Sequence, residues 1–237
     1  MYFTCKILVP EVFTHRDPLS EPFKKSFKVM KFGCLPKLTD EGRRVILFSH
    51  SRPDGEDYEP EVLFKRISMM LDILLLEGVD YVGCEVVIDC TNVCFSQLTR
   101  YDLSLTKKTV DVGLKAIPQR VHRIHMVNPN SILDASLSLF RPILPKKLTN
   151  RFIIHRDFKS LPATLGLDCT PSDLGGDGPS TEEINNFWEK KLIAYRDWFI
   201  ENDHIKTDES KRIGKCRYEN NDCTFGHQGS FKKMEVD

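Results

Sequence analysis

Residues 122–155 read HRIHMVNPNSILDASLSLFRPILPKKLTNRFIIH, and this stretch decides the fold. Its hydrophobic pattern predicts a strand over residues 122–127, a helix over residues 131–141 and a second strand over residues 151–155. A strand, a crossover helix and another strand form one unit of a parallel sheet, because parallel neighbours need a long connection. The stretch therefore favours an α/β domain.

The helix over residues 131–141 is separated from both strands by prolines at positions 129, 142 and 145. Proline removes a backbone donor and disfavours helical backbone in the residue before it, so each proline acts as a stop. One broad side of the helix is apolar and is formed by Ile132, Leu133, Leu137 and Phe140. The pattern fits either a hinged cover or a well-stopped core helix, and periodicity alone favours the core helix.

The same alternation of strands and helices runs upstream. Strands are predicted over residues 43–48 and 83–89, and helices over residues 61–77 and 96–117. The first of these helices is apolar around most of its surface, which indicates burial on more than one side. Residues 1–40 read as short helical pieces and connectors. Repeated strand, helix, strand order predicts an α/β domain with a largely parallel sheet.

Beyond residue 176 the chain changes character. A helix start at residues 179–183 is followed by aromatic and aliphatic side chains at helical spacing. We expect this helix to dock on the domain rather than to present an exposed partner site. From residue 203 on, low hydrophobicity and mixed charge predict a disordered polar tail.

Composition excludes several classes of protein. Lys+Arg and Asp+Glu both number 34, so no net charge draws the chain onto nucleic acid. The eight cysteines include no CxxC pair, which indicates free thiols in a reducing compartment. Residues 1–10 lack the apolar core of a secretory signal, and the sequence has no run of about 18 apolar residues that would span a membrane.

No reaction centre stands out in the sequence. Cys94 and Arg100 have the C-x5-R spacing of cysteine phosphatases, but the loop between them has no glycine to turn its amides toward a phosphate. Cys216, Cys223 and His227 offer three zinc ligands, yet the spacing is long and a fourth ligand is missing. The chain has no phosphate-binding glycine loop, HExxH or GxSxG motif. We therefore expect neither an enzyme nor a metal or cofactor site.

A basic cluster, formed by Lys146, Lys147 and Arg151, follows the amphipathic helix. It is either a set of solvated surface charges or a contact for an anionic membrane, where each cation adds about 1 kcal/mol of attraction. A membrane contact beside an apolar cover would suit a lipid carrier. Burying a lipid chain stabilises it by about 0.8 kcal/mol per methylene, so release requires a gate that opens at the bilayer.

Seven short motifs follow one another in order, namely Gly42 to Val45, Val87 to Asp89, Ala116 to Arg120, Val127 to Pro129, Arg141 to Leu144, Lys147 to Arg151 and Thr170 to Gly176. Together they resemble the CRAL-TRIO lipid-binding family, and within it the group of alpha-tocopherol transfer and retinaldehyde-binding proteins. The resemblance implies an N-terminal helical remnant over residues 1–34, a lipid-binding domain over residues 35–200 and the polar tail over residues 201–237.

The resemblance implies a mixed, largely parallel sheet that floors a hydrophobic cavity, flanked by helices and closed by a mobile helical gate. It also implies phosphoinositide binding by Lys146, Lys147 and Arg151. The apolar side chains expected to line the cavity or its gate are Phe64, Ile67, Met70, Leu71, Leu74, Val86, Ile88, Ile124, Met126, Ile132, Leu133, Leu137, Phe140, Ile143, Leu144, Leu161, Leu165 and Leu167.

Three segments depart from the family's pattern. Ile117 stands where the family often has tyrosine, residues 90–92 lack the usual glycine, and residues 170–174 replace a leucine-proline-x-glutamate-tyrosine pattern. These departures affect the choice of cargo and the anchoring of the gate. A further phosphate contact expected from the missing N-terminal helices has no counterpart.

The resemblance implies a monomeric, non-enzymatic cytoplasmic carrier that binds one hydrophobic ligand, such as a tocopherol, a retinoid or a related lipid. It would move this cargo between anionic, phosphoinositide-containing membranes through peripheral contact, without a cofactor, a metal or nucleic acid. The alternative is a ligand-regulated adaptor whose tail or aromatic C-terminal helix binds a protein. A cysteine phosphatase is a distant third.

Overall fold

A five-stranded mixed sheet organises the computed structural model, which describes residues 6–51, 56–116, 119–156 and 159–205 together with residues 208 and 211. The strands lie in sequence order, β1 to β5. β1 is antiparallel to β2, and the other three neighbouring pairs are parallel. The strands are β1 (Met30–Leu38), β2 (Arg44–His50), β3 (Cys84–Asp89), β4 (Val121–Val127) and β5 (Phe152–His155). The predicted mixed, largely parallel sheet is confirmed.

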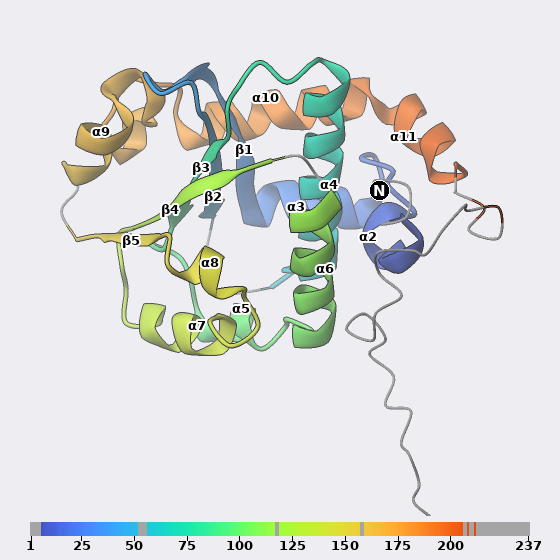
Figure 1. Ribbon diagram of the computed structural model, residues 1–237, viewed down its shortest axis with the longest axis horizontal. Helices are drawn as coiled ribbons and strands as arrows, with labels where there is room; N and C mark the ends of the chain where they lie inside the picture. Colours follow the sequence, from blue (N-terminus) through green and yellow to red (C-terminus); the bar gives the residue numbers. More distant parts are fainter. Residues whose placement is uncertain are drawn as a thin grey trace, which may run out of the picture. The chain divides into compact units, whose positions relative to one another are not determined.

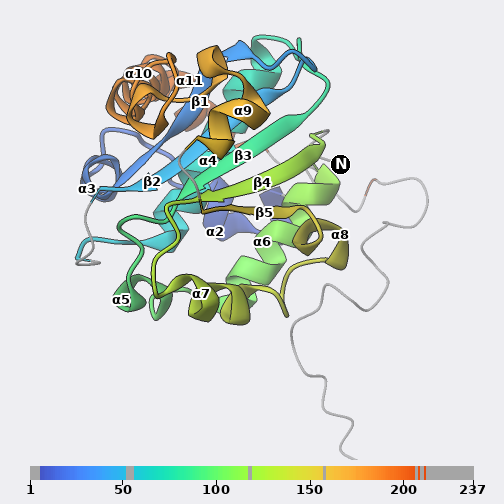
Figure 2. The same ribbon diagram turned by 90° about the vertical axis from the view of Figure 1, so that its left-hand side faces the viewer.

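The crossovers between parallel strands are helical. They are α4 (Pro60–Leu76) before β3, α5 (Phe95–Leu98) and α6 (Leu103–Ala116) before β4, and α7 (Leu133–Phe140) and α8 (Lys146–Thr149) before β5. After β5 come α9 (Ser160–Leu165), the 3-10 turns η1 (Leu167–Cys169) and η2 (Ser172–Leu174), α10 (Thr181–Ala194) and α11 (Arg196–Asp203). α7 and α9 lie on opposite faces of the sheet (Figures 1 and 2).

Strand alternation and register define the two faces by their residues. We call the side that carries Ile46, Phe48, His50, Val86, Ile88, Ile124 and Met126 the α7 face. We call the side that carries Val45, Leu47, Ser49, Glu85, Val87, Asp89, His125 and Val127 the α9 face. α4 contacts the α7 face at β1, where the Cys34 Sγ lies 3.3 Å from the Met70 Sδ. α10 packs on the other side of the same strand.

The N-terminal segment is more ordered than the sequence predicted. Met30–Leu38 is a full edge strand rather than a connector, because its pairing with β2 overrides the weak local signal from Gly33 and Pro36. Before it lie α2 (Pro10–Phe13) and α3 (Glu21–Val29). Arg16, fully buried, binds Asp72 of α4 at 2.6 Å and Asp203 of α11 at 3.0 Å. The segment is thus tied to both helices by buried charge.

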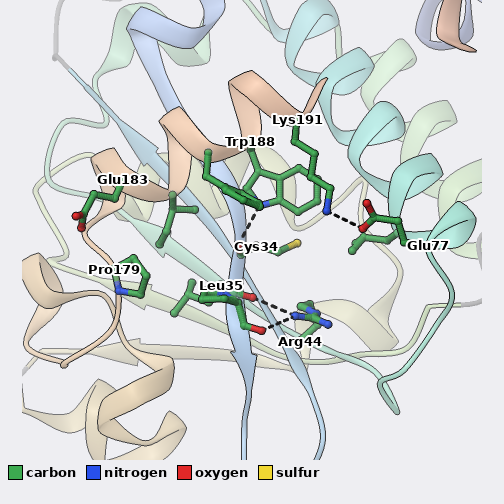
Figure 3. A pocket seen from close by; sticks show the side chains of 12 residues that line it. Cys34, Leu35, Arg44, Glu77, Pro179, Glu183, Trp188 and Lys191 are labelled. Carbon is green, nitrogen blue, oxygen red and sulfur yellow. Dashed lines mark hydrogen bonds and ion pairs between the residues drawn. The ribbon is translucent and has the colours of Figure 1, made fainter. Parts of the chain in front are cut away.

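The C-terminal helix docks as predicted. Ser180 caps α10 with a capping box, and the buried side of the helix carries Ile184, Trp188 and Leu192. The Trp188 indole donates to the Cys34 carbonyl at 2.9 Å (Figure 3). A side chain at Gly33 would overlap the indole ring. α11 reaches residue 203 of the predicted tail, whereas Cys216, Cys223 and His227 lie outside the described residues.

Candidate ligand-binding site

The two faces of the central strand β3 differ in burial. Glu85 and Val87, on the α9 face, are both 0% exposed. Their neighbours Val86 and Ile88, on the α7 face, remain half-buried. Central strands of parallel sheets are normally covered on both faces. Side chains therefore do not fill the space above the α7 face completely.

Other apolar side chains predicted to contact cargo are half-buried as well. On α4, Phe64, Ile67 and Leu71 follow the i, i+3, i+7 spacing of one helix side and are all half-buried. Beyond α4, the same burial class holds for Ile132, Phe140, Ile143 and Leu144 around α7. Nine of the eighteen apolar side chains predicted to contact cargo are thus half-buried.

A cavity of about 150 Å³ lies between the sheet and α7. This volume equals about five water molecules, at roughly 30 Å³ each, and is smaller than the roughly 300–1,000 Å³ of ligand pockets. With α7 in its present position, the cavity is too small for a whole lipid molecule. It is lined by His50, Ile88, Cys90, Val93, Gln97, Leu98, Tyr101, Met126, Leu133, Ser136 and Phe140.

α7 closes this cavity through a small apolar cluster of its own. Leu133 and Leu137 are buried against Met126 and Cys90, in a cluster separate from the main core. Burial of two leucine side chains stabilises the closed position by about 3–6 kcal/mol. At the end of α7 the Phe140 ring meets the edge of Tyr101, with centroids 4.9 Å apart and an interplanar angle of 81°.

The segment before α7 is fixed by side-chain amides. Asn128 adopts a positive φ of 51°, and its Nδ2 donates to Asp89 Oδ1 at 3.0 Å. The Asn130 Nδ2 donates to the carbonyls of Cys90 at 2.8 Å and Val93 at 2.7 Å. After α7, Pro142 and Pro145 prevent the helix from continuing. One end of α7 is therefore anchored, and the other ends at a proline-containing turn.

Polar side chains that were not among the predicted ligand contacts also line the cavity. The hydroxyl groups of Tyr101 and Tyr58 lie 2.5 Å apart, and the Ser136 hydroxyl donates to the Ile132 carbonyl at 2.9 Å. His50 packs its ring on Tyr58 with centroids 5.1 Å apart. Strand alternation from Ile46 through Phe48 would have placed His50 on the apolar side of β2.

Burial governs the ionisation of His50. Desolvation lowers the pKa of its imidazole to about 4, although the nearby Asp89 carboxylate acts in the opposite direction. The Nδ1 of His50 is buried and has no hydrogen-bond partner among the residues that the structure describes. The ring is therefore neutral at pH 7.

The predicted basic cluster is divided between two roles. Lys146 and Lys147 are exposed on α8, next to the turn that follows α7. Arg151 is half-buried, and its guanidinium donates to the Val121 carbonyl of β4. Two of the three cations thus face solvent beside α7, while the third binds strand backbone.

Several other predicted contacts lie away from this cavity. Met70 and Leu74 of α4 are buried in the main core. Leu161 and Leu165 belong to α9, which covers the opposite face, and both are buried in that core. Leu167 is 54% exposed in η1. The segment after β5 folds into a short helix and turn over the α9 face, so these three leucines do not reach the cavity under α7.

The phosphatase spacing does not form a phosphate cradle. The Cys94 amide donates to the Gln97 Oε1 at 3.1 Å, as part of the capping of the four-residue helix α5. That amide is therefore occupied by the chain's own side chain. Among the residues that the structure describes, no group of three His, Cys, Asp or Glu side chains is placed to hold a metal ion.

A buried polar chain crosses the α9 face. Arg43 binds Glu85 at 2.5 Å, Glu85 contacts His125 Nε2 at 3.2 Å, and His125 Nδ1 lies 2.8 Å from His155 Nε2. His155 Nδ1 then meets the Ser160 hydroxyl at 2.7 Å. Burial, followed by the charge of His125, lowers the pKa of His155. For Glu85, burial acts to raise the pKa, but hydrogen bonds from His125 and Arg43 outweigh it and leave the pKa lowered. The chain joins Arg43, the residue before β2, to β3, β4, β5 and α9.

A second, open groove of about 450 Å³ lies beside α10, and its main polar groups bind one another (Figure 3). Lys191 pairs with Glu77 at 2.6 Å, and the Arg44 Nη1 donates to the carbonyls of Leu35 at 3.2 Å and Pro36 at 3.0 Å. The polar groups of this groove thus mainly hold α10, α4 and β1 together.

A mixed sheet with one packed face and one apolar, incompletely covered face beneath a proline-bounded helix defines an α/β domain suited to enclosing an apolar ligand. The model of the CRAL/TRIO domain matches residues 28–176, and the chain belongs to this family.

The chain is similar to several curated proteins of this family. It is 25% identical over 203 residues to the alpha-tocopherol transfer protein-like proteins of Homo sapiens and Pongo abelii, and 24% identical to that of Mus musculus. These matches cover 84% of this chain, and it spans 58% of the human and orangutan proteins. The crystal structure of Sfh5 matches with a TM-score of 0.51 and 14% identity, over 79% of this chain and 70% of that one. This last match supports the fold. Among the described residues, no helix is long and apolar enough to cross a bilayer.

Proposed function

We propose that this protein carries one hydrophobic molecule on the α7 face of its sheet and exchanges it at membranes by moving α7. The observation that carries the proposal is the unequal burial of β3, where Val86 and Ile88 stay half-buried while Glu85 and Val87 are completely buried. Leaving apolar side chains of a central strand partly exposed to water is unfavourable, so we expect another apolar group to cover them.

We propose a contact set drawn from the sheet, α4 and the gate. From the sheet it takes Val86, Ile88, Ile124 and Met126, and from α4 it takes Phe64, Ile67 and Leu71. The gate contributes Ile132, Leu133, Leu137, Phe140, Ile143 and Leu144. The similarity to alpha-tocopherol transfer protein-like proteins makes a tocopherol the first cargo to test. No step of this role requires catalysis, a cofactor or a metal ion.

We propose that α8 guides the gate to anionic membranes. Lys146 and Lys147 are exposed beside α7, so a negatively charged surface, including one with phosphoinositides, would attract the same side of the protein that opens. Arg151 contributes to this field from a fixed position, since its guanidinium already binds Val121. We expect the protein to be a cytoplasmic monomer that associates peripherally with membranes. The five free cysteines of the described residues fit a reducing compartment such as the cytoplasm.

The adaptor alternative has less support. Its helix would have to present an apolar side, but Ile184, Trp188 and Leu192 are buried in the main core. Phe187, at 57% exposed, is the large apolar side chain of α10 that faces solvent.

The test is mass spectrometry of lipids that co-purify with the protein from cells. We expect a stoichiometric lipid in the wild type and a loss of at least about tenfold in Phe140→Asp, because a carboxylate beside Tyr101 opposes apolar closure. Ser138→Asp is the matched control, since Ser138 is exposed on the same helix. An empty wild type, or full loading of Phe140→Asp, would contradict the proposal.

A further inference from the structure

His50 occupies a fixed position at the edge of the cavity under α7. It is the last residue of β2, on the same face as Ile46 and Phe48. Its carbonyl accepts from the Asn92 Nδ2 at 3.0 Å, and its ring packs on Tyr58. The imidazole is therefore held in place before any ligand enters.

One nitrogen of this ring, Nδ1, lacks a hydrogen-bond partner among the described residues. The Nδ1 of His50 is buried without a hydrogen bond in the described structure, while the ring lines the 150 Å³ cavity. The other polar side chains of the same wall have partners, since Tyr101 binds Tyr58, Ser136 binds the Ile132 carbonyl and Gln97 accepts from the Cys94 amide. A buried polar atom without a partner is unfavourable, so it is a place where a ligand group gains affinity.

The charge of the site selects the class of ligand group. Burial keeps the imidazole neutral, and the nearby Asp89 carboxylate, on the opposite face of the sheet, is already bound by Ser49, Thr91 and Asn128. A hydroxyl both donates and accepts, so it satisfies either tautomer of a neutral imidazole. A carboxylate or phosphate could pair with only one tautomer and would bring an uncompensated charge into an apolar cavity, and a hydrocarbon end would leave the nitrogen unsatisfied.

We propose that the cavity under α7 receives the hydroxyl end of a hydrophobic ligand, with His50 Nδ1 as the hydrogen-bond partner of that hydroxyl. This inference rests on the carrier function proposed above and names the chemistry of its cargo. The small cavity holds the hydroxyl end, while the apolar remainder lies along the half-buried side chains of the α7 face, such as Val86 and Phe48.

The test compares four lipid alcohols with their methyl ethers, namely α-tocopherol, all-trans-retinol, cholesterol and dodecan-1-ol. Binding of each pair is measured by titration against wild type, His50→Leu and His50→Gln. We expect at least one alcohol to bind the wild type about tenfold more tightly than its ether, because the ether cannot donate and adds a methyl group in a closed space. In His50→Leu the preference falls below about twofold, and His50→Gln retains part of it.

The outcomes separate the two proposals. Binding of no lipid in any pair would overturn both the carrier function and this inference. Tight but equal binding of alcohol and ether by the wild type, or a preference unchanged in His50→Leu, would overturn this inference alone. Ile88→Leu is the control in the same cavity wall, and it should affect both members of a pair equally. Denaturant unfolding of each variant verifies that it is folded.

Discussion

The α9 face and the α7 face belong to the same strands but have different contents. On the α9 face, β3 contributes a completely buried Glu85 within a continuous chain of hydrogen bonds, together with a completely buried Val87. On the α7 face, it contributes the half-buried Val86 and Ile88 and borders a cavity. In the proposed function the two faces divide the work, since one face supplies stability and the other supplies the binding surface. Substitutions of neighbouring residues on one strand can separate the two.

The largest expected effect is loss of stability in Glu85→Ala. Removing one partner of a buried ion pair costs about 3–5 kcal/mol, because Arg43 and His125 lose their acceptor. Urea unfolding measures the change in the free energy of unfolding. Glu41→Ala is the matched control, since Glu41 pairs with the same arginine from an exposed position and should cost less than about 1 kcal/mol. Equal effects of the two variants would contradict the role of the buried chain.

Two identical substitutions on adjacent residues test the faces directly. Val87→Ala should lower the free energy of unfolding by about 2–3 kcal/mol, since it leaves a cavity in the main core. Val86→Ala should cost less than about 1 kcal/mol but weaken lipid binding about fourfold, equal to one lost methylene contact. Unfolding curves and lipid titration of both variants give the comparison. Equal destabilisation by Val86→Ala and Val87→Ala would contradict the proposed difference between the two faces of β3.

His50 gives the α7 face a pH dependence. Its pKa of about 4 in the folded state lies below the 6.5 of an unperturbed histidine, so the unfolded chain binds the proton more readily. The stabilisation is present above pH 6.5 and is lost as pH falls toward 4. Between pH 7 and pH 5 we expect a loss of about 2 kcal/mol, measured by urea unfolding. In His50→Leu the free energy of unfolding should fall by about 2 kcal/mol less over that range than in the wild type. If the free energies of unfolding of the two proteins depend on pH in the same way, the His50 ring is not buried in its neutral form.

The smallest expected effect concerns the membrane. Lys147→Ala should weaken binding to anionic vesicles by about 1 kcal/mol, or roughly fivefold, in a sedimentation assay at low salt. Lys190→Ala, an equally simple loss of an exposed lysine from α10, should have little effect because α10 lies on the other side of the sheet. Similar losses in both variants would mean that attraction is not localised to α8.

The strands β2 to β5 and the largely parallel sheet could be predicted from the sequence, because each of these strands is a short apolar run separated from the next by a helical pattern. The edge strand β1 could not, since Gly33 and Pro36 weaken its signal and pairing with β2 supplies the missing stabilisation. The apolar side of α7 was identified, and the structure places Leu133, Leu137 and Phe140 on the cavity wall or its cluster.

The polar part of the site was harder to predict. A single histidine at the end of a strand carries no distinguishing signal, and the significance of His50 depends on the buried, unpartnered Nδ1, which spacing does not reveal. Leu161 and Leu165 are equally apolar in sequence, but the chain between β5 and α10 takes them to the α9 face. Hydrophobicity predicted burial in each case, whereas the surface that buries each residue depends on the path of the chain in three dimensions.

The separation of the α7 cluster from the main core allows local opening without global unfolding. Four buried residues hold α7, whereas Leu47, Val87 and Trp188 belong to the larger core that holds the sheet. If the closed position is favoured by about 3–6 kcal/mol, then about one molecule in 10² to 10⁴ has α7 detached at equilibrium. The amide hydrogens of α7 would then exchange with solvent far earlier than those of β3, through fluctuations that occur in every molecule while its sheet stays folded.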